Sequence, residues 1–308
     1  MNDQNSCKVI IPVFYPGKIV VNCINSIPKN FEIFILDNGL DDYNLENEIK
    51  KLNREITIYK VGDVGVAQSF NFALSKITSE FFFITQPDVT IKKNCIENLI
   101  KSAKVYKDAA ILSPVIYEEG LYSEFDFYNL KITKENKLSK NQKKKEKNRE
   151  IKEPVNDFNV EAINSTALLV KTAIIKEVGG WDSKFYTYLE DIDISLRARQ
   201  LGYKIIKIVN SKADHLGFSS HKIENKESID RSRNWHFSWS SVYFASKHYD
   251  KWFFYKILIK KMLKYLLKIF VNIILFRKKK LLSNYLRLNA CVSFLKNKKS
   301  HYRPKKIK

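Results

Sequence analysis

Short apolar runs alternate with helical patterns early in the chain, and this alternation constrains the fold more than any other feature of the sequence. Runs rich in β-branched and aromatic residues span Lys8 to Val13, Glu32 to Asp37, Ile56 to Val61 and Phe81 to Thr85. An amphipathic helical pattern from Val66 to Ile77 separates the third run from the fourth. Strands spaced by helices in this way predict an α/β fold, with a mostly parallel sheet covered on both faces.

Two carboxylates lie where predicted strands end. Asp37 ends the second strand just before an Asn-Gly turn signal, and Asp88 follows the fourth strand after a Gln-Pro pair. Sheets of this kind bind ligands beyond the carboxyl ends of their strands. Asp37 and Asp88 are therefore better candidates for a ligand site than carboxylates inside a helix.

A further group of carboxylates, Glu190, Asp191 and Asp193, lies at the start of a predicted helix. Acidic groups are favoured there by the helix dipole, so an ordinary charged helix start is one interpretation. The stretch from Gly179 to His215 favours a second interpretation, a catalytic site. In this stretch a glycine-hinged aromatic loop precedes the acids, and a lone histidine follows the next strand. A carboxylate beside aromatic side chains suits the removal of a proton from a sugar hydroxyl.

The net charge of +21 is concentrated in two segments. Residues 131–152 hold 10 Lys and Arg against 3 Glu, and Lys251 to Lys308 hold 18 Lys and Arg with no acidic residue. We interpret the first as a mobile basic insertion at about residues 131–153. The four cysteines form no C-x-x-C pair and no secretory signal is recognisable, which predicts a protein of the reducing cytoplasm.

The second basic segment belongs to a C-terminal region, residues 223–308, that we expect to be helical and distinct from a domain at residues 1–222. Trp252 to Phe276 is strongly apolar, yet five lysines interrupt it within a helical arc of about 140°. A central lysine costs roughly 2.5–3.5 kcal/mol in a spanning helix, so spanning is disfavoured. These lysines are Lys256, Lys260, Lys261, Lys264 and Lys268.

Such a helix is expected to lie in a membrane interface, with its lysines toward anionic headgroups. A packed helical hairpin with solvated lysines is the alternative interpretation. Nucleic acid is the rival partner for so basic a tail. The long apolar face, which phosphate binding does not require, favours an anionic membrane surface over nucleic acid.

Several motifs, in order, resemble the inverting, family 2 type glycosyltransferases with a GT-A fold. They are VIIPVF, ILDN, GVAQSFNFAL, TQPDVT, GGWD, YLEDIDISLR and the later His215, spread over Cys7 to His221. Each motif is weak alone, and their shared order and spacing make the resemblance specific. Within the family, the chain looks most like bacterial rhamnosyl- or galactofuranosyl-type enzymes that build surface polysaccharides.

The resemblance implies a role for each matching residue. Asp191 matches the catalytic base, with Glu190 beside it. Trp181 would form part of the acceptor platform, and Asp182 would either contact the acceptor or fix the turn. The residues expected to bind the nucleotide sugar are Pro12, Val13, Asp37, Asn38, Gly65, Asn71 and Asp88.

The resemblance also implies a divalent cation, Mg²⁺ or Mn²⁺, held by Asp88 and His215. Asp88 matches the last acid of an Asp-x-Asp motif, whose first acid is replaced here by Gln86. A hard cation can take most of its ligands from diphosphate and water, so this replacement does not exclude activity. It leaves the protein with only one carboxylate and one histidine as metal ligands. Metal affinity is therefore expected to be low when the nucleotide-sugar donor is absent.

The implied reaction moves a sugar from a UDP- or dTDP-sugar to a lipid-linked glycan at the cytoplasmic face of the cell membrane. A single displacement, with Asp191 taking the acceptor's proton, inverts the anomeric centre. Transfer to polyprenyl phosphate is an alternative. A catalytically degenerate, membrane-bound assembly partner is another, which Gln86 favours and the intact Asp191 and His215 oppose.

Overall fold

The computed structural model describes residues 7–14, 17–39, 45–124, 127–128, 153–217 and 226–303. The basic segment 131–152, interpreted above as an insertion, lies outside the described residues. The strands are β1 (Cys7–Val13), β2 (Ile33–Asp37), β3 (Ile56–Lys60), β4 (Phe81–Thr85), β5 (Val89–Ile91), β6 (Ala109–Glu118), β7 (Leu121–Ser123), β8 (Phe127–Tyr128), β9 (Phe158–Val160), β10 (Ala162–Ile163), β11 (Ala167–Lys171) and β12 (Lys204–His215). The helices are α1 (Ile19–Ser26), α2 (Leu45–Lys50), α3 (Val66–Lys76), α4 (Cys95–Val105), α6 (Thr172–Glu177), α7 (Glu190–Gln200), α8 (Lys226–His248), α9 (Lys251–Ile274) and α10 (Lys278–Leu295).

The chain divides into two compact units. The first comprises Met1–Gly62, Phe72–Gly180 and Ile194–Ser220, and the second comprises Asp63–Asn71, Trp181–Asp193 and His221–Lys308. The long segment of the second unit is His221–Lys308, and the predicted boundary after residue 222 stays a prediction. The predicted C-terminal region does not include the two short segments Asp63–Asn71 and Trp181–Asp193. Both segments form hydrogen bonds with the long one, such as those of Asp63 with Arg303 and of Asp182 with Tyr243.

The first unit is built on a mixed sheet with the strand order β3-β2-β1-β4-β11-β6-β12-β5. Strands β1 to β4 pair in parallel where they touch, and β12 is parallel to β6, whereas β11 and β5 run antiparallel to their neighbours. The predicted α/β class is confirmed. The antiparallel strands agree with the mixed, mostly parallel sheet that the GT-A resemblance implies, although the sequence does not mark which buried strands run antiparallel.

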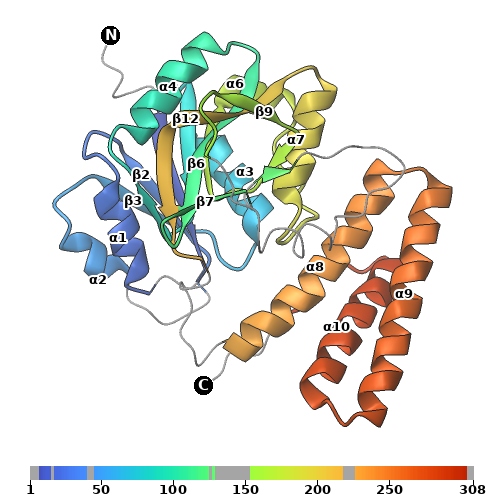
Figure 1. The fold of residues 1–308 in the computed structure, drawn as a ribbon. Helices are drawn as coiled ribbons and strands as arrows, with labels where there is room; N and C mark the ends of the chain where they lie inside the picture. The colour runs from blue at the N-terminus through green and yellow to red at the C-terminus, as the bar shows by residue number, and fades with distance from the viewer. Residues whose placement is uncertain are drawn as a thin grey trace. The chain divides into compact units, whose positions relative to one another are not determined.

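Side chains on both faces of this sheet are buried. Val9 and Ile11 of β1 pack with α1, α2 and α4 in one apolar cluster, and Figure 1 shows α1 and α2 beside β2 and β3. The alternate residues Ile10 and Phe82 point to the other face and are also buried. Burial of both faces explains why these strands read as continuous apolar runs.

The second unit contains the three long helices α8, α9 and α10, drawn in orange and red in Figure 1. Phe254 and Leu258 of α9 pack with Val242 of α8 and Cys291 of α10. Lys261 of α9 differs from the sequence-based expectation that it faces outward. It donates to the hydroxyl of Ser241, and burial lowers its pKa to about 8.

Arg54 fixes the connection between α1 and β2 in the first unit. Its guanidinium donates to the carbonyls of Ile24, Ile27, Pro28 and Phe31 at 2.6, 2.9, 3.0 and 3.2 Å. These carbonyls lie at or just beyond the end of α1, where a helix leaves acceptors without intrahelical partners. One side chain therefore ties the last turn of α1 to the connection that follows it.

We expect Arg54→Ala to lower the free energy of unfolding by about 2–3 kcal/mol, because charged donors are lost and acceptors remain unpaired. Arg54→Lys should recover only part of this, because a single ammonium cannot match the planar fork. Urea unfolding followed by circular dichroism measures both. Lys51→Ala, at an exposed surface ion pair with Glu48, is the control, and an equal effect of the two alanine variants would contradict the assignment.

Candidate active site

The carboxyl ends of β1 and β2 bring four of the predicted nucleotide-binding residues together in the first unit. Val13 lies beside Asp37 and Pro12 beside Leu36 in the parallel register. The backbone N–H of Asn38 donates to the carbonyl of Val13 at 2.8 Å, and its buried side chain donates to Leu36 at 3.2 Å. Asn38 thus shapes the turn from inside.

Asp37 is half-buried at the same place. Its carboxylate accepts a hydrogen bond of 2.8 Å from the backbone N–H of Gly39, whose φ of 63° suits glycine. A fixed carboxylate at the carboxyl edge of a parallel sheet is well suited to a polar ligand group. Its contact with a nucleotide remains a prediction.

Asp88 and His215, the predicted metal-binding pair, lie together in the first unit. His215 ends β12, which pairs with β5 and places His215 opposite Val89. Its Nε2 is 3.6 Å from Oδ2 of the buried Asp88. Residues 127 positions apart are therefore brought together by one antiparallel strand pair.

Glu118 is the partner of this pair that sequence reasoning missed. Its Oε1 is 3.2 Å from Nδ1 of His215, so the imidazole lies between two carboxylates. Glu118 ends β6, which runs parallel to β12, so the two carboxyl ends coincide. The parallel pairing of β6 with β12 is what brings Glu118 to His215, and the sequence alone does not show which strands pair.

The two carboxylates control the charge of His215. Burial alone would lower the pKa of its imidazole, but the hydrogen bonds and charges of Asp88 and then Glu118 outweigh burial and raise it. The two acids thereby favour the protonated form of the ring and hold it in place from both sides. A divalent cation would displace the proton at Nε2, because only neutral imidazole is a metal ligand.

The chemistry of this pair fits a divalent cation. One carboxylate oxygen and one imidazole nitrogen 3.6 Å apart match two donors that are each about 2.0–2.2 Å from a shared ion. Among the residues that the structure describes, no group of three or more His, Cys, Asp or Glu is placed to hold a metal.

Gly65 and Asn71 belong to the second unit. Both contact the loop at residues 181–189, here called the aromatic loop. Gly65 has a φ of +86°, and a Cβ there would lie 2.4 Å from the carbonyl oxygen of Tyr186. The adjacent N–H of Val66 donates to that carbonyl at 2.7 Å. Only glycine allows this approach, and nucleotide binding by this segment remains a prediction.

Asn71 holds the backbone of Trp181 in both directions. Its amide donates to the Trp181 carbonyl at 2.6 Å and accepts from the Trp181 N–H at 2.8 Å. The indole packs on Phe70, with ring centroids 5.1 Å apart, and Trp181 is only 2% exposed. This burial argues against the predicted acceptor platform, because a sugar needs an accessible ring to stack on.

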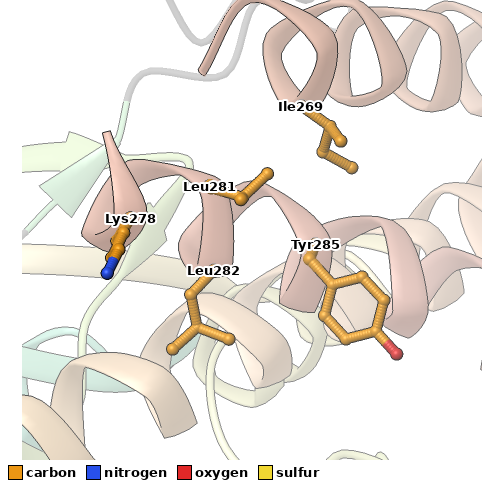
Figure 2. A pocket seen from close by; sticks show the side chains of 5 residues that line it. All are labelled: Ile269, Lys278, Leu281, Leu282 and Tyr285. Carbon is orange, nitrogen blue, oxygen red and sulfur yellow. The ribbon is translucent and has the colours of Figure 1, made fainter. Parts of the chain in front are cut away.

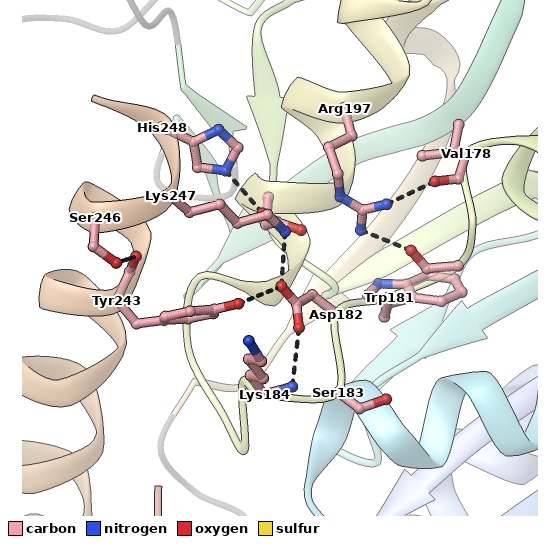
Figure 3. Close-up of polar contacts among 12 residues, drawn as sticks. Val178, Trp181, Asp182, Ser183, Lys184, Arg197, Tyr243, Ser246, Lys247 and His248 are labelled. Carbon is pink, nitrogen blue, oxygen red and sulfur yellow. Dashed lines mark hydrogen bonds and ion pairs between the residues drawn. The ribbon is translucent and has the colours of Figure 1, made fainter. Parts of the chain in front are cut away.

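Asp182 is also committed to contacts within the second unit. Its Oδ2 accepts from Tyr243 at 2.7 Å and from Lys247 at 2.8 Å, and its Oδ1 accepts from the backbone of Lys184 at 3.0 Å (Figure 3). Burial alone would raise the pKa of Asp182, but the hydrogen bonds from Lys247 and Tyr243 lower it. Of its two predicted roles, these contacts favour fixing the turn.

Lys247 links this turn to the acidic segment. Its ammonium is 2.7 Å from Oδ1 of Asp193. The same oxygen is 2.8 Å from Nε2 of His248, and Asp193 is 0% exposed. Asp193 and Asp182 therefore share one lysine of α8. Buried carboxylates require such partners, since an unpaired buried charge is strongly destabilising.

One face of α8 supports the whole aromatic loop. Tyr186 stacks on His236 with centroids 4.5 Å apart, Ser240 donates to the carbonyl of Thr187 at 2.8 Å, and Tyr243 and Lys247 bind Asp182. These four residues of α8 are spaced three or four positions apart, so they lie on one face of the helix. His236 itself is buried, and burial lowers its pKa to about 3, so it is a neutral structural residue.

The acidic helix start follows a strained backbone. Tyr188 and Leu189 have φ values of 69° and 70°, a conformation that costs of order 1–3 kcal/mol for each non-glycine residue. Such strain persists only where surrounding contacts impose it, and it gathers at functional sites. Here it immediately precedes Glu190 and Asp191.

Glu190 and Asp191 differ sharply in environment. Glu190 is buried, and its Oε2 has no hydrogen-bond partner among the described residues. Burial first, and then the negative charge of Asp191, raise the pKa of Glu190 well above its ordinary value. Asp191 is half-buried, and its Oδ1 accepts from the N–H of Ile192 at 2.8 Å. Two neighbouring carboxyl groups whose environments differ in this way are a usual arrangement for acid–base chemistry.

The mixed sheet defines an α/β protein, and the polar groups at the carboxyl ends of its strands lie where sheets of this kind bind ligands. The profile described as Glycosyl transferase family 2 matches residues 8–162. The chain therefore belongs to glycosyl transferase family 2. No curated protein sequence gives a significant match.

Solved structures show the same fold. The mannosyltransferase PcManGT from Pyrobaculum calidifontis, in complex with GDP-Man and Mn²⁺, aligns with a TM-score of 0.55 at 12% identity, over 96% of this chain and 88% of its own. GalNAc-T7 with UDP, GalNAc and Mn²⁺ aligns with a TM-score of 0.51 at 15% identity, over 74% of this chain. The match spans half the length of GalNAc-T7. These likenesses confirm the GT-A fold.

The raised pKa of Glu190 predicts a pH dependence of stability. The folded protein keeps a proton that the unfolded chain releases above about pH 4.5, so Glu190 destabilises the fold increasingly as the pH rises from there. We expect Glu190→Gln to gain stability relative to the parent protein over the same range. Melting temperatures from pH 4.5 upward measure this. The exposed Glu97→Gln on α4 is the control, and parallel curves for Glu190→Gln and the parent protein would contradict the prediction.

Proposed function

We propose that this family 2 protein is an inverting glycosyltransferase that uses a nucleotide-diphosphate sugar, with Asp191 as the catalytic base. The observation that carries the proposal is the contrast between Glu190 and Asp191. Burial, and then the negative charge of Asp191, disfavour the ionised form of Glu190, whereas Asp191 is the more accessible of the two carboxyl groups. A positioned carboxylate of this kind can accept a hydroxyl proton.

In the proposed reaction, the acceptor oxygen attacks the anomeric carbon of the donor sugar. The bond from that carbon to the diphosphate oxygen breaks, and the nucleoside diphosphate leaves with the bonding electrons. Asp191 takes the proton of the acceptor hydroxyl. The attack comes from the face opposite the leaving group, so the anomeric configuration inverts. No nucleophilic carboxylate is required.

The residues proposed to hold the donor are those that end β1 and β2, together with the Gly65 to Asn71 segment. Asp88 and His215 would hold a Mg²⁺ or Mn²⁺ ion, which neutralises charge on the departing diphosphate. Glu118 would keep His215 oriented through Nδ1. The nucleotides and Mn²⁺ bound by PcManGT and GalNAc-T7 support this proposal. We propose UDP or dTDP as the donor nucleotide.

For the acceptor, we propose a lipid-linked glycan of bacterial surface polysaccharide synthesis, as the resemblance to rhamnosyl- and galactofuranosyl-type enzymes suggests. Polyprenyl phosphate is the alternative acceptor. The basic C-terminal region supports work at the cytoplasmic face of an anionic membrane. In the described part of the chain, none of the helices has the length and apolar character needed to cross a bilayer.

A second candidate, a catalytically degenerate assembly partner, draws on Gln86 in place of the first acid of the metal motif. The two candidates differ in nucleotide binding. Titrating UDP and dTDP with and without Mn²⁺ distinguishes them, because a degenerate partner has no metal-coupled nucleotide affinity. A screen of UDP-, dTDP- and GDP-sugars for release of nucleoside diphosphate then identifies the donor.

We expect Asp191→Asn to reduce transfer by about 10²- to 10⁴-fold, because the amide cannot accept the proton. Binding of UDP or dTDP with Mn²⁺, measured by calorimetry, should stay within a few fold of the parent value. Asp230→Asn, at an exposed ion pair on α8, is the matched control. Loss of nucleotide binding together with transfer would show that Asp191 has another role.

We expect Glu118→Gln to weaken Mn²⁺ binding by about 10- to 100-fold, because His215 loses the carboxylate that orients its ring. Electron paramagnetic resonance of free Mn²⁺, in the presence of nucleotide, measures the affinity without any turnover. The neighbouring exposed Glu119→Gln serves as control. Equal affinities for the two variants would remove Glu118 from the proposed site.

A further inference from the structure

Helix α9 has an apolar face that the packing of the second unit does not use. Phe254, Leu258 and Tyr265 are buried against the other helices. Seven large side chains on another face, here called the apolar stripe, are each between 48% and 71% exposed. At about 100° per residue they fall within an arc of about 80°. The stripe consists of Trp252, Tyr255, Ile259, Leu263, Leu266, Phe270 and Ile273.

Basic side chains border the stripe and its end. Lys256, Lys260 and Lys264 are exposed along one side of it. At the turn into α10, Phe276 is 88% exposed, with a φ of 52°. The exposed residues 277–280, one arginine and three lysines, follow it directly. The most protruding apolar side chain of the turn is thus surrounded by positive charge.

A groove lies between α9 and α10 close to this turn. It has a volume of about 330 Å³ and is lined by Ile269, Leu281, Leu282, Tyr285 and Lys278. Figure 2 shows Leu281 of α10 toward Ile269 of α9, with Lys278 at one end. The lining is therefore almost entirely hydrocarbon, which suits an apolar chain, and Lys278 lies at one end of the groove, where a basic side chain suits an anionic head.

We propose that the α9–α10 hairpin is a phospholipid-binding element. The apolar stripe and Phe276 enter the acyl region of an anionic bilayer, the groove takes one lipid chain, and Lys278 binds the phosphate of that lipid. This inference rests on the proposed membrane association. Beyond that association, the apolar stripe and Phe276 are the side chains that enter the membrane, and an anionic phospholipid is the molecule that they contact.

Charge complementarity selects a bilayer over a second copy of the chain. From Lys251 to Lys308 the chain carries 18 Lys and Arg and no acidic residue. Two stripes packed together would bring the flanking lysines of both copies close, with no carboxylate from this region to pair them. Anionic headgroups neutralise the same lysines while the acyl chains cover the stripe.

Trp252 provides a direct test, because the three other tryptophans, Trp181, Trp235 and Trp239, are buried. The full chain is mixed with phosphatidylcholine vesicles, with or without phosphatidylglycerol, whose acyl chains carry bromine. We expect quenching of the tryptophan emission with the anionic vesicles and its loss in Trp252→Phe. Binding without quenching would overturn the proposal, because the stripe would then lie outside the acyl region.

Vesicle flotation with variants tests the two parts of the element. Leu263→Ser with Phe270→Ser should weaken binding to anionic vesicles about tenfold or more, through lost apolar burial. Lys278→Gln with Leu282→Asn should weaken it similarly. An excess of inorganic phosphate should leave binding of the parent protein intact, because phosphate lacks the chain. Displacement by inorganic phosphate, or parent-like binding of either pair, would overturn the proposal.

Val105→Ser with Leu201→Ser is the matched control, since both side chains are exposed apolar residues of the first unit. It should bind vesicles like the parent protein. If the stripe variant instead dissociates a dimer in light scattering without lipid, a second copy covers the stripe and the proposal fails. Tight RNA binding that both hairpin variants abolish would overturn it too.

Release of nucleoside diphosphate from the donor, measured without vesicles, separates this inference from the proposed function. The stripe variant should keep the parent rate, since none of its changed residues belongs to the proposed catalytic or donor-binding groups. A parent protein that turns over donor but ignores anionic vesicles would overturn the lipid inference and leave the glycosyltransferase standing.

Discussion

A single ammonium group, that of Lys247, fixes the loop that leads to the acidic helix. It is 2.8 Å from Asp182 at one end of the loop and 2.7 Å from the buried Asp193 at the other. A fully buried carboxylate is tolerable only when it is paired, so the loop must close onto α8. With both ends held, Tyr188 and Leu189 are kept in a left-handed conformation that neither would adopt alone. The buried Glu190 and the half-buried Asp191 directly follow these two residues.

The sheet was largely predictable because apolar runs of strand length are a local signal. The expected runs at 8–13, 32–37, 56–61 and 81–85 correspond to β1 to β4 within a residue or two, and the helical pattern after Gly65 corresponds to α3. The pairing of Asp88 with His215 was reached through the resemblance. Glu118 carries no such signal, since it meets His215 from 97 positions away through the parallel pairing of β6 with β12.

The limits of sequence reasoning are clearest for the C-terminal region. Its charge and apolar pattern correctly indicated helices, yet nothing in that pattern revealed that α8 supports the aromatic loop. The contacts depend on His236, Ser240, Tyr243 and Lys247, ordinary polar residues on a helix until the loop is seen against them. Lys261 likewise has the same sequence context as its exposed neighbours and differs only in what α8 places beside it.

The packing of α10 against α8 has a consequence for how the protein tolerates cleavage. Trp235 and Trp239 of α8 share their apolar cluster with Leu286 and Ala290 of α10. A protease that cut after α8 would strip this cover and leave two indoles in water, on the helix that anchors the acidic loop. The helix α10 is therefore part of the core around α8, and cleavage after α8 is expected to destabilise the helix that holds the acidic loop.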